Sequence, residues 1–133
     1  MASHPQFMLH DTGPGHPERP ARLTAVMDGI DAAGVRDAVV HFEPEPAPWD
    51  AIERVHPGRY LLALEELSAL GGGHIDADTV LGEESFSALL RAAGAGLDAV
   101  ARLDAGEGDV AFCAVRPPGH HATPRQAMGF CLV

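Results

Sequence analysis

DVAFCAVRPPGHHA, residues 109–122, places a strand-like run directly before a stiff Pro-Pro-Gly turn and two adjacent histidines. Residues 109–115 are the most strand-like run in the chain, and a small, an aromatic and a thiol residue (GFC) follow at residues 129–131. Parallel sheets collect their chemistry in the loops that leave the carboxyl ends of strands. This order therefore predicts a buried strand that delivers a polar loop to the edge of a sheet.

The two histidines, His120 and His121, are the first candidates for chemistry. Neighbouring side chains on a regular strand point to opposite faces, so both can enter one pocket only if the backbone leaves regular geometry. Pro118 and Gly119 supply that break. Histidine has the side-chain pKa nearest neutrality, and a converging pair suits proton transfer. On these residues alone, catalysis, metal binding and a solvated surface loop all stay open.

Helical periodicity dominates the chain between its ends. Apolar residues recur with the spacing of a helix face in three long segments and one short segment. The predicted helices are residues 17–33 (regular from about Pro20), 49–55, 58–70 and 85–103.

Extended structure is predicted for residues 39–42 and 109–115, whereas residues 1–6 look too short and polar to form a strand. The proline-rich residues 43–48 are expected to form a stiff linker, and residues 74–79 a polar capping and turn loop. Long helices that alternate with strands favour an α/β fold, a parallel sheet flanked by helices.

Composition limits the classes of protein that fit. The chain has 133 residues, 46% hydrophobic and 21% charged, which is one domain or less. A formal net charge of −10 argues against nucleic acid and anionic membranes as partners and would tolerate a cationic substrate. Two cysteines do not make a disulfide framework, and no stretch reads as a signal peptide, so a cytoplasmic protein is expected.

Three blocks of the sequence carry a family resemblance: RPPGHHA at 116–122, GFC at 129–131, and HPERPxR at 16–22. Together they resemble the bacterial and class II side of the histone deacetylase superfamily, which includes acetylpolyamine amidohydrolases and acetoin-utilisation proteins. The resemblance implies that residues 1–133 form the N-terminal part of an arginase/deacetylase-like domain. It also implies a zinc-dependent hydrolysis of N-acetyl amides, of the acetyl-lysine or acetylpolyamine type, in full-length relatives.

The resemblance assigns roles to the tandem histidines. One would act as general base on a water molecule and then as acid to the leaving amine, while the other would supply electrostatic stabilisation. Family precedent favours His121 as the base and His120 as its partner. Arg116 is expected to brace the loop, and His16 to be structural.

By the same resemblance, Gly129 and Phe130 would line a narrow substrate channel. Arg22 would lie in an internal channel through which acetate leaves. Asp78, or else Asp76, would reach the pocket rim and hold the substrate amide.

The resemblance implies Zn²⁺ as the cofactor, but the family's metal ligands and its later tyrosine have no counterparts in this sequence. The chain alone is therefore expected to be inactive. An alternative is a non-catalytic binding or dimerisation module derived from this fold, with self-association through an exposed sheet edge. A further alternative is an unrelated metal-binding protein that uses His74, Asp76, Asp78, His120 and His121.

Overall fold

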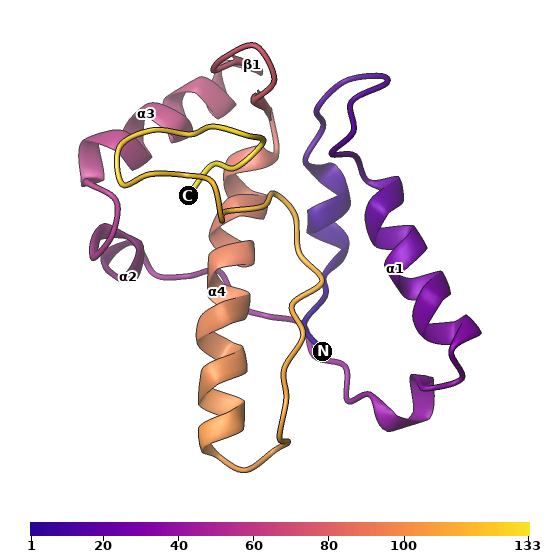
Figure 1. The fold of residues 1–133 in the computed structure, drawn as a ribbon. Coiled ribbons are helices and arrows are strands. Elements are labelled where there is room, and N and C mark those ends of the chain that lie inside the picture. Colours follow the sequence, from indigo (N-terminus) through magenta and orange to yellow (C-terminus); the bar gives the residue numbers. More distant parts are fainter.

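The long helix α4 (Ser85–Asp104) is the axis of the molecule in the structure, a computed structural model that describes residues 1–133. Figure 1 shows α2 (Trp49–Glu53) and α3 (Gly58–Ala69) on one side of it, and α1 (Ala21–Ala32) on the other. Two short 3₁₀ helices, Pro5–Leu9 and Arg36–Ala38, complete the helical elements.

All four predicted helices are confirmed. Prolines directly precede three of them, where the missing N–H costs nothing: Pro20 before α1, Pro48 before α2 and Pro57 before α3. Beyond the end of α1, Gly34 has φ 66°, the left-handed conformation with which helices commonly stop.

The predicted parallel sheet is present only as isolated pairings. Ala2 lies between Phe42 and Cys113 and forms a parallel bridge with each. The N–H of Ala2 donates to the Phe112 carbonyl, and the N–H of Ala114 donates to the Ala2 carbonyl, both at 2.9 Å. The expected α/β fold is therefore confirmed, and its parallel sheet consists here of three short extended segments around Ala2, Phe42 and Cys113.

Two details of that expectation are wrong. Residues 39–42 and 109–115 do not form full strands, because each is paired along one edge for only one or two residues. The expected burial of the second segment is also absent at its start, since Val110 is 87% exposed and Phe112 53% exposed. Residues 1–6 look too short and polar for a strand, yet Ala2 lies between the other two segments.

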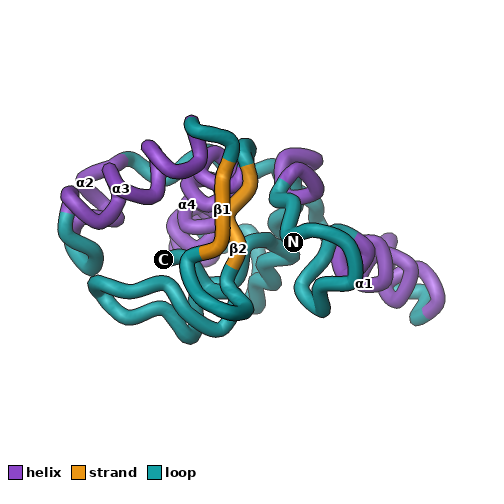
Figure 2. Tube along the Cα trace, turned by 90° about the horizontal axis from the view of Figure 1, so that it is seen from above, coloured by secondary structure: helices purple, strands orange, loops and turns teal.

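A small antiparallel hairpin was not predicted. Strands β1 (Gly72–His74) and β2 (Val80–Gly82) pair with Gly73 opposite Leu81, and the predicted polar loop is the hairpin tip. Figure 2 shows β1 and β2 side by side, with α3 on one side and α1 on the other. A Cβ at Gly72 would lie 2.0 Å from the Leu81 carbonyl oxygen, so this strand needs a glycine.

The apolar core lies where α2, α3, α4, β2 and the C-terminal segment meet. Its members share near-complete burial: Ala47, Ile52, Leu61, Leu64, Leu81, Phe86, Leu89, Ala127 and Leu132. None of the helices combines the length and apolar character that a membrane crossing requires.

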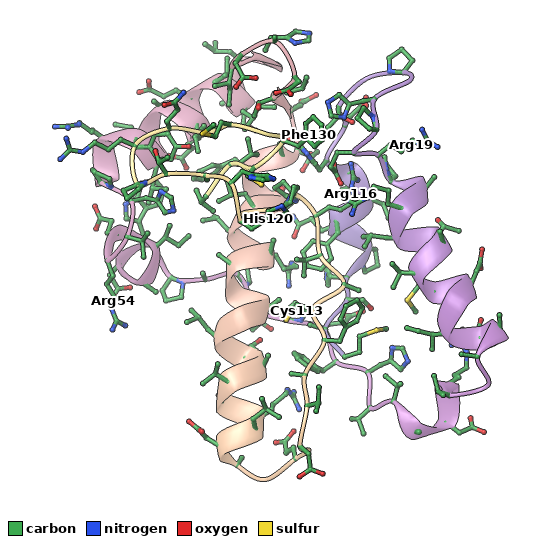
Figure 3. The ribbon with its side chains drawn as sticks, in the orientation of Figure 1. Arg19, Arg54, Cys113, Arg116, His120 and Phe130 are labelled. Carbon is green, nitrogen blue, oxygen red and sulfur yellow. The ribbon has the colours of Figure 1, made fainter.

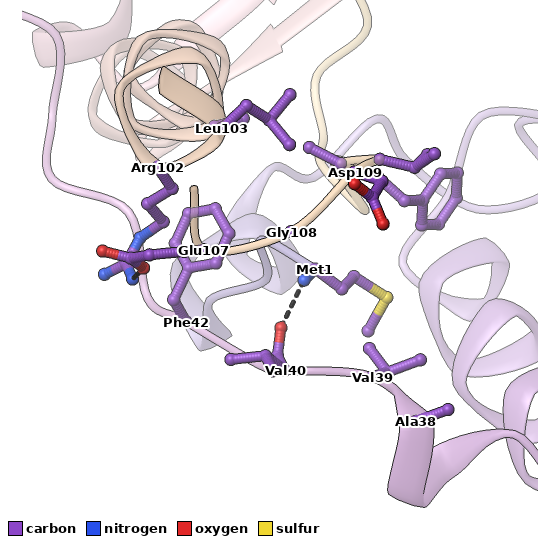
Figure 4. A pocket seen from close by; sticks show the side chains of 14 residues that line it. Met1, Ala38, Val39, Val40, Phe42, Arg102, Leu103, Glu107, Gly108 and Asp109 are labelled. Atoms are coloured by element: carbon purple, nitrogen blue, oxygen red, sulfur yellow. Dashed lines mark hydrogen bonds and ion pairs between the residues drawn. The ribbon is translucent and has the colours of Figure 1, made fainter. Parts of the chain in front are cut away.

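The opposite side of the molecule leaves apolar surface uncovered. Helix α1 has no fully buried residue. A mostly apolar groove of about 490 Å³ lies at the C-terminal end of α4, lined by Met1, Val40, Phe42 and Phe112 among others (Figure 4). Arg102 covers one edge, with its guanidinium 4.4 Å from the centre of the Phe42 ring.

Candidate active site

A second cavity, of about 450 Å³, lies beside the tandem-histidine turn. Its lining residues come from two parts of the chain that are far apart in sequence: Pro17, Glu18, Arg22, Pro118, His120, His121, Gly129 and Phe130. Five of the six predicted site residues are in this set, and only Asp78 is outside it. In Figure 3, His120 and Phe130 lie close together, with Arg116 beside them.

The two histidine rings lie close together. Their centroids are 4.3 Å apart, with the planes inclined by 53°, and both residues are exposed to solvent. A Cβ on Gly119 would lie 2.2 Å from the Val133 carbonyl oxygen, so only glycine lets the turn pass this closely. The N–H of His121 also points to the Cys131 sulfur at 3.3 Å.

Gly129 and Phe130, the predicted channel residues, form the centre of a tight turn. Met128 and Cys131 close it with two backbone hydrogen bonds, each 3.0 Å long. A Cβ on Gly129 would lie 3.1 Å from atoms of the His121 ring, so the glycine lets that ring lie flat against the backbone. The Phe130 ring meets the edge of the His16 ring, with centroids 4.9 Å apart.

The hairpin tip lies next to this turn, but its acids serve the loop itself. The Asp76 carboxylate accepts hydrogen bonds from the N–H groups of Asp78 (3.0 Å) and Thr79 (2.7 Å). These bonds, led by the one from Asp78, lower the pKa of Asp76 below its ordinary value. Asp78 is exposed; its carbonyl lies 3.0 Å from His16 Nε2, and its carboxylate accepts the Thr79 hydroxyl proton at 3.3 Å.

The metal-binding alternative finds no support in these positions. No group of three or more His, Cys, Asp or Glu side chains in residues 1–133 is placed to hold a metal ion. The five residues of that hypothesis are therefore not brought together.

Behind the cavity is a buried ionic cluster centred on Glu18. Arg116 Nε and Nη2 each donate to one oxygen of the Glu18 carboxylate, at 2.7 Å. The same guanidinium donates to the carbonyls of Phe7 and His10, both at 2.9 Å. Arg116 is 0% exposed and so braces the segment that leads into the histidine turn, as expected.

Arg22 on α1 reaches the same carboxylate from the cavity side, donating to Glu18 Oε1 at 2.9 Å. Burial alone would raise the pKa of Glu18, but the hydrogen bonds and charge of Arg116, with Arg22, hold it below its ordinary value. Two guanidinium groups thus share one carboxylate. Arg22, which is 55% exposed, keeps N–H groups available to an anion in the cavity.

His10 extends this cluster towards α4. Burial, with the nearby charge of Arg116 adding to it, lowers the pKa of His10 to about 4, so the ring is neutral near pH 7. Ser85 Oγ accepts the N–H of Gly82 at 2.7 Å and lies 2.6 Å from His10 Nδ1. On the other side of the ring, His10 Nε2 is buried without a hydrogen-bond partner, and Glu18 Oε2 lies 3.5 Å from it.

Sequence reasoning missed Glu18, His10 and Thr79. Glu18 carried one usable signal, since an acid four residues before Arg22 on a helix start predicts an ion pair. His10 and Thr79 gave none, because their partners become neighbours only in the folded chain.

Comparison with known proteins places these residues in context. The histone deacetylase domain family matches residues 16–133. An uncharacterized protein of Synechocystis sp. is 39% identical over 131 residues, which cover 96% of this chain and 43% of that protein. The histone deacetylase-like amidohydrolase of Pseudomonas aeruginosa is 37% identical over 118 residues, covering 89% of this chain and 31% of the relative.

The fold agrees with the sequence match. The crystal structure of the HDA15 HD domain superposes with a TM-score of 0.89 and 32% identity, covering 98% of this chain and 38% of that chain. The chain therefore spans between about a third and two fifths of the length of these proteins.

Proposed function

This chain belongs to the histone deacetylase family, and from that premise we propose that it carries the histidine, channel and product-side part of a zinc-dependent deacetylase. The reaction is the hydrolysis of N-acetyl amides, with acetyl-lysine or an acetylated polyamine as substrate. The observation that carries the proposal is one cavity lined by His120, His121, Gly129, Phe130 and Arg22.

The proposed chemistry of the histidines is proton transfer. Amide hydrolysis needs a base that takes a proton from the attacking water and an acid that gives one to the leaving amine. A neutral imidazole can do both in turn, and we assign this role to His121. The ring of His120, 4.3 Å away, then supplies electrostatic stabilisation to the charged form of its neighbour.

The other residues of the site would bind the substrate and the acetate product. The flat ring of Phe130 suits the methylenes of an acyl-lysine or acyl-polyamine chain. Asp78, on the rim, would accept an N–H of the substrate. Arg22 would receive the acetate product, because a guanidinium with free N–H groups pairs well with a carboxylate.

The residues present do not by themselves form a zinc site. Catalytic zinc usually has three protein ligands, and no such group occurs in residues 1–133. We therefore assign the zinc ligands to residues outside this chain. On this basis the isolated chain, with zinc added, should not hydrolyse an acetyl-lysine peptide or an acetylpolyamine.

A chimera tests the proposal directly. Residues 16–133 would replace the matched segment of the Pseudomonas aeruginosa amidohydrolase, and zinc-dependent release of acetate would be measured. We expect turnover, and a kcat lower by about 10²–10⁴-fold for His121→Ala. Arg125→Ala, an exposed change in the same loop, is the matched control. A folded, zinc-loaded chimera that is inactive, or one that is indifferent to His121→Ala, would refute the proposal.

A second candidate is a non-catalytic dimerisation module, favoured by the uncovered edge near residues 109–112. Val110 is 87% exposed there, and unpaired extended segments invite pairing with another chain. Sedimentation over a range of concentrations should then show a dimer. Val110→Lys should abolish it, whereas Val55→Lys, at a site 60% exposed just after α2, should not. A monomer at all concentrations rules this candidate out.

A further inference from the structure

Phe130 is held in a backbone conformation that aromatic residues rarely adopt. Its φ of 72° makes it the only non-glycine residue of the chain with positive φ. With Gly129 at φ 57°, it forms the centre of a turn of the type in which asparagine and glycine are strongly preferred. A large side chain in this conformation persists only where the surroundings hold it there.

One such constraint is the hydroxyl of Thr79. The N–H of Phe130 donates to Thr79 Oγ1 at 3.2 Å. Thr79 is 0% exposed, and its backbone is fixed within the hairpin tip, with its N–H on Asp76 (2.7 Å) and its carbonyl on the N–H of Ile75 (2.8 Å). The hydroxyl is therefore a rigid acceptor that lies where the left-handed backbone directs the Phe130 N–H.

The second constraint is the ring of His16. Its Nε2 lies 3.0 Å from the Asp78 carbonyl, which can only accept, so Nε2 donates there, while Nδ1 lies 3.1 Å from the N–H and 2.9 Å from the carbonyl of Glu18. Both nitrogens are thus engaged, and the ring cannot turn freely. Its edge-to-face contact with Phe130, at 77°, fixes the direction of the phenyl ring.

We propose that Thr79 and His16 are positioning residues for Phe130, so that the hairpin tip sets the backbone and ring orientation of one wall of the cavity. That Phe130 forms a wall of a substrate channel rests on the proposed function, whereas its positioning by Thr79 and His16 does not.

The test uses the full 133-residue chain and nuclear magnetic resonance. Thr79→Val removes the acceptor at nearly constant shape, and Thr79→Ser keeps it. With valine we expect φ-sensitive couplings and Cα shifts of Phe130 to leave the positive-φ range, and nuclear Overhauser effects between the Phe130 and His16 rings to weaken. With serine both signals should stay at their wild-type values. A folded valine variant with both signals unchanged overturns the proposal.

Phe130→Gly supplies a second measurement, which also covers poor folding of the valine variant. Glycine adopts positive φ without penalty, so a residue that acts through the Phe130 backbone becomes dispensable in this background. Thr79→Val should lower the melting midpoint by roughly 3–6 °C in the wild type and by clearly less in Phe130→Gly. Equal losses in the two backgrounds, or unfolding in both, contradict the proposal. Neither measurement depends on deacetylase activity, so the proposed function can fail while this inference stands.

Discussion

The two sides of α4 hold their neighbours in different ways. The side with α2, α3 and the hairpin closes around an apolar core in which Leu61 and Leu89 are 0% exposed. The side with α1 has apolar residues at helical spacing but buries none of them fully. On that side the contact is polar, because Arg22 of α1 and the buried Arg116 both donate to the Glu18 carboxylate.

This difference shows what positions the cavity. The turns that carry His121 and Phe130 are anchored on the side with the apolar core, whereas Arg22 arrives from the side without one. Glu18 joins the two sides, so the shape of the cavity depends on one buried carboxylate.

The largest expected effect comes from removing the Glu18 carboxylate, which connects the two sides of α4. Glu18→Ala leaves the buried Arg116 charge without its partner, which should lower the free energy of unfolding by about 3–5 kcal/mol. Urea denaturation measures the loss. Glu65→Ala, on the exposed face of α3, is the control and should change little. A small effect of Glu18→Ala would mean that apolar contacts, and not the ion pair, join the two sides.

Matched truncations compare the two sides directly. Leu89→Ala opens a cavity in the core and should cost about 2–5 kcal/mol, whereas Ile30→Ala on α1 removes a side chain that is only partly buried and should cost clearly less, about 1 kcal/mol. The same denaturation assay applies. Equal losses would show that α1 is covered in solution, for example by a second copy of the chain.

Acid should lower the free energy of unfolding without any substitution, through the buried groups His10 and Glu18. The pKa of His10 is about 4 in the folded chain against 6.5 for the free side chain, so between these values the unfolded chain binds more protons. The free energy of unfolding should therefore fall as pH drops from 6.5 towards 4, by about 3 kcal/mol in total. Glu18, whose pKa is also lowered, adds to the loss below pH 4.5.

Denaturation at pH 7, 5.5 and 4.5 measures this slope. His10→Gln should flatten it, while His41→Gln, at an exposed site, should not. An unchanged slope in His10→Gln would assign the pH dependence to other groups.

The smallest effect on stability is expected at the tandem histidines. His120→Ala and His121→Ala remove exposed rings, so the free energy of unfolding should stay within about 0.5 kcal/mol of the wild type. Thermal melting checks this. A clear loss would show that the rings support the turn rather than serve chemistry alone.

Sequence reasoning found the helices because their apolar spacing is local. Residues such as Phe86 and Leu89 mark the buried face of α4 without reference to any partner. The extended segments could not be predicted in this way, because a strand forms only where a neighbouring segment supplies hydrogen bonds. Residues 109–111 have no such neighbour. The glycine-rich β1 carries no alternation that could have predicted the hairpin.

The residues of the candidate site also differ in whether local sequence could predict them. His120, His121, Gly129 and Phe130 are marked by unusual residue order within a short stretch. Glu18 and Arg116 are 98 positions apart, and their pairing at 2.7 Å depends on burial, which no local pattern records. The buried side chains that hold the cavity were therefore harder to predict than those that line it.

The parallel pairing of Ala2 has a consequence for synthesis on the ribosome. Ala2 bonds to Phe112 and Ala114, and Ser3 to Phe42, so the middle of this small sheet cannot form until residue 114 has left the exit tunnel. The helices between, and the bonds of Met1 and Ser3 to Phe42, can form as those residues emerge, but the backbone groups of Ala2 must wait in water for residues 112–114. A chaperone that binds nascent chains would find this edge of Ala2 available until residue 114 emerges.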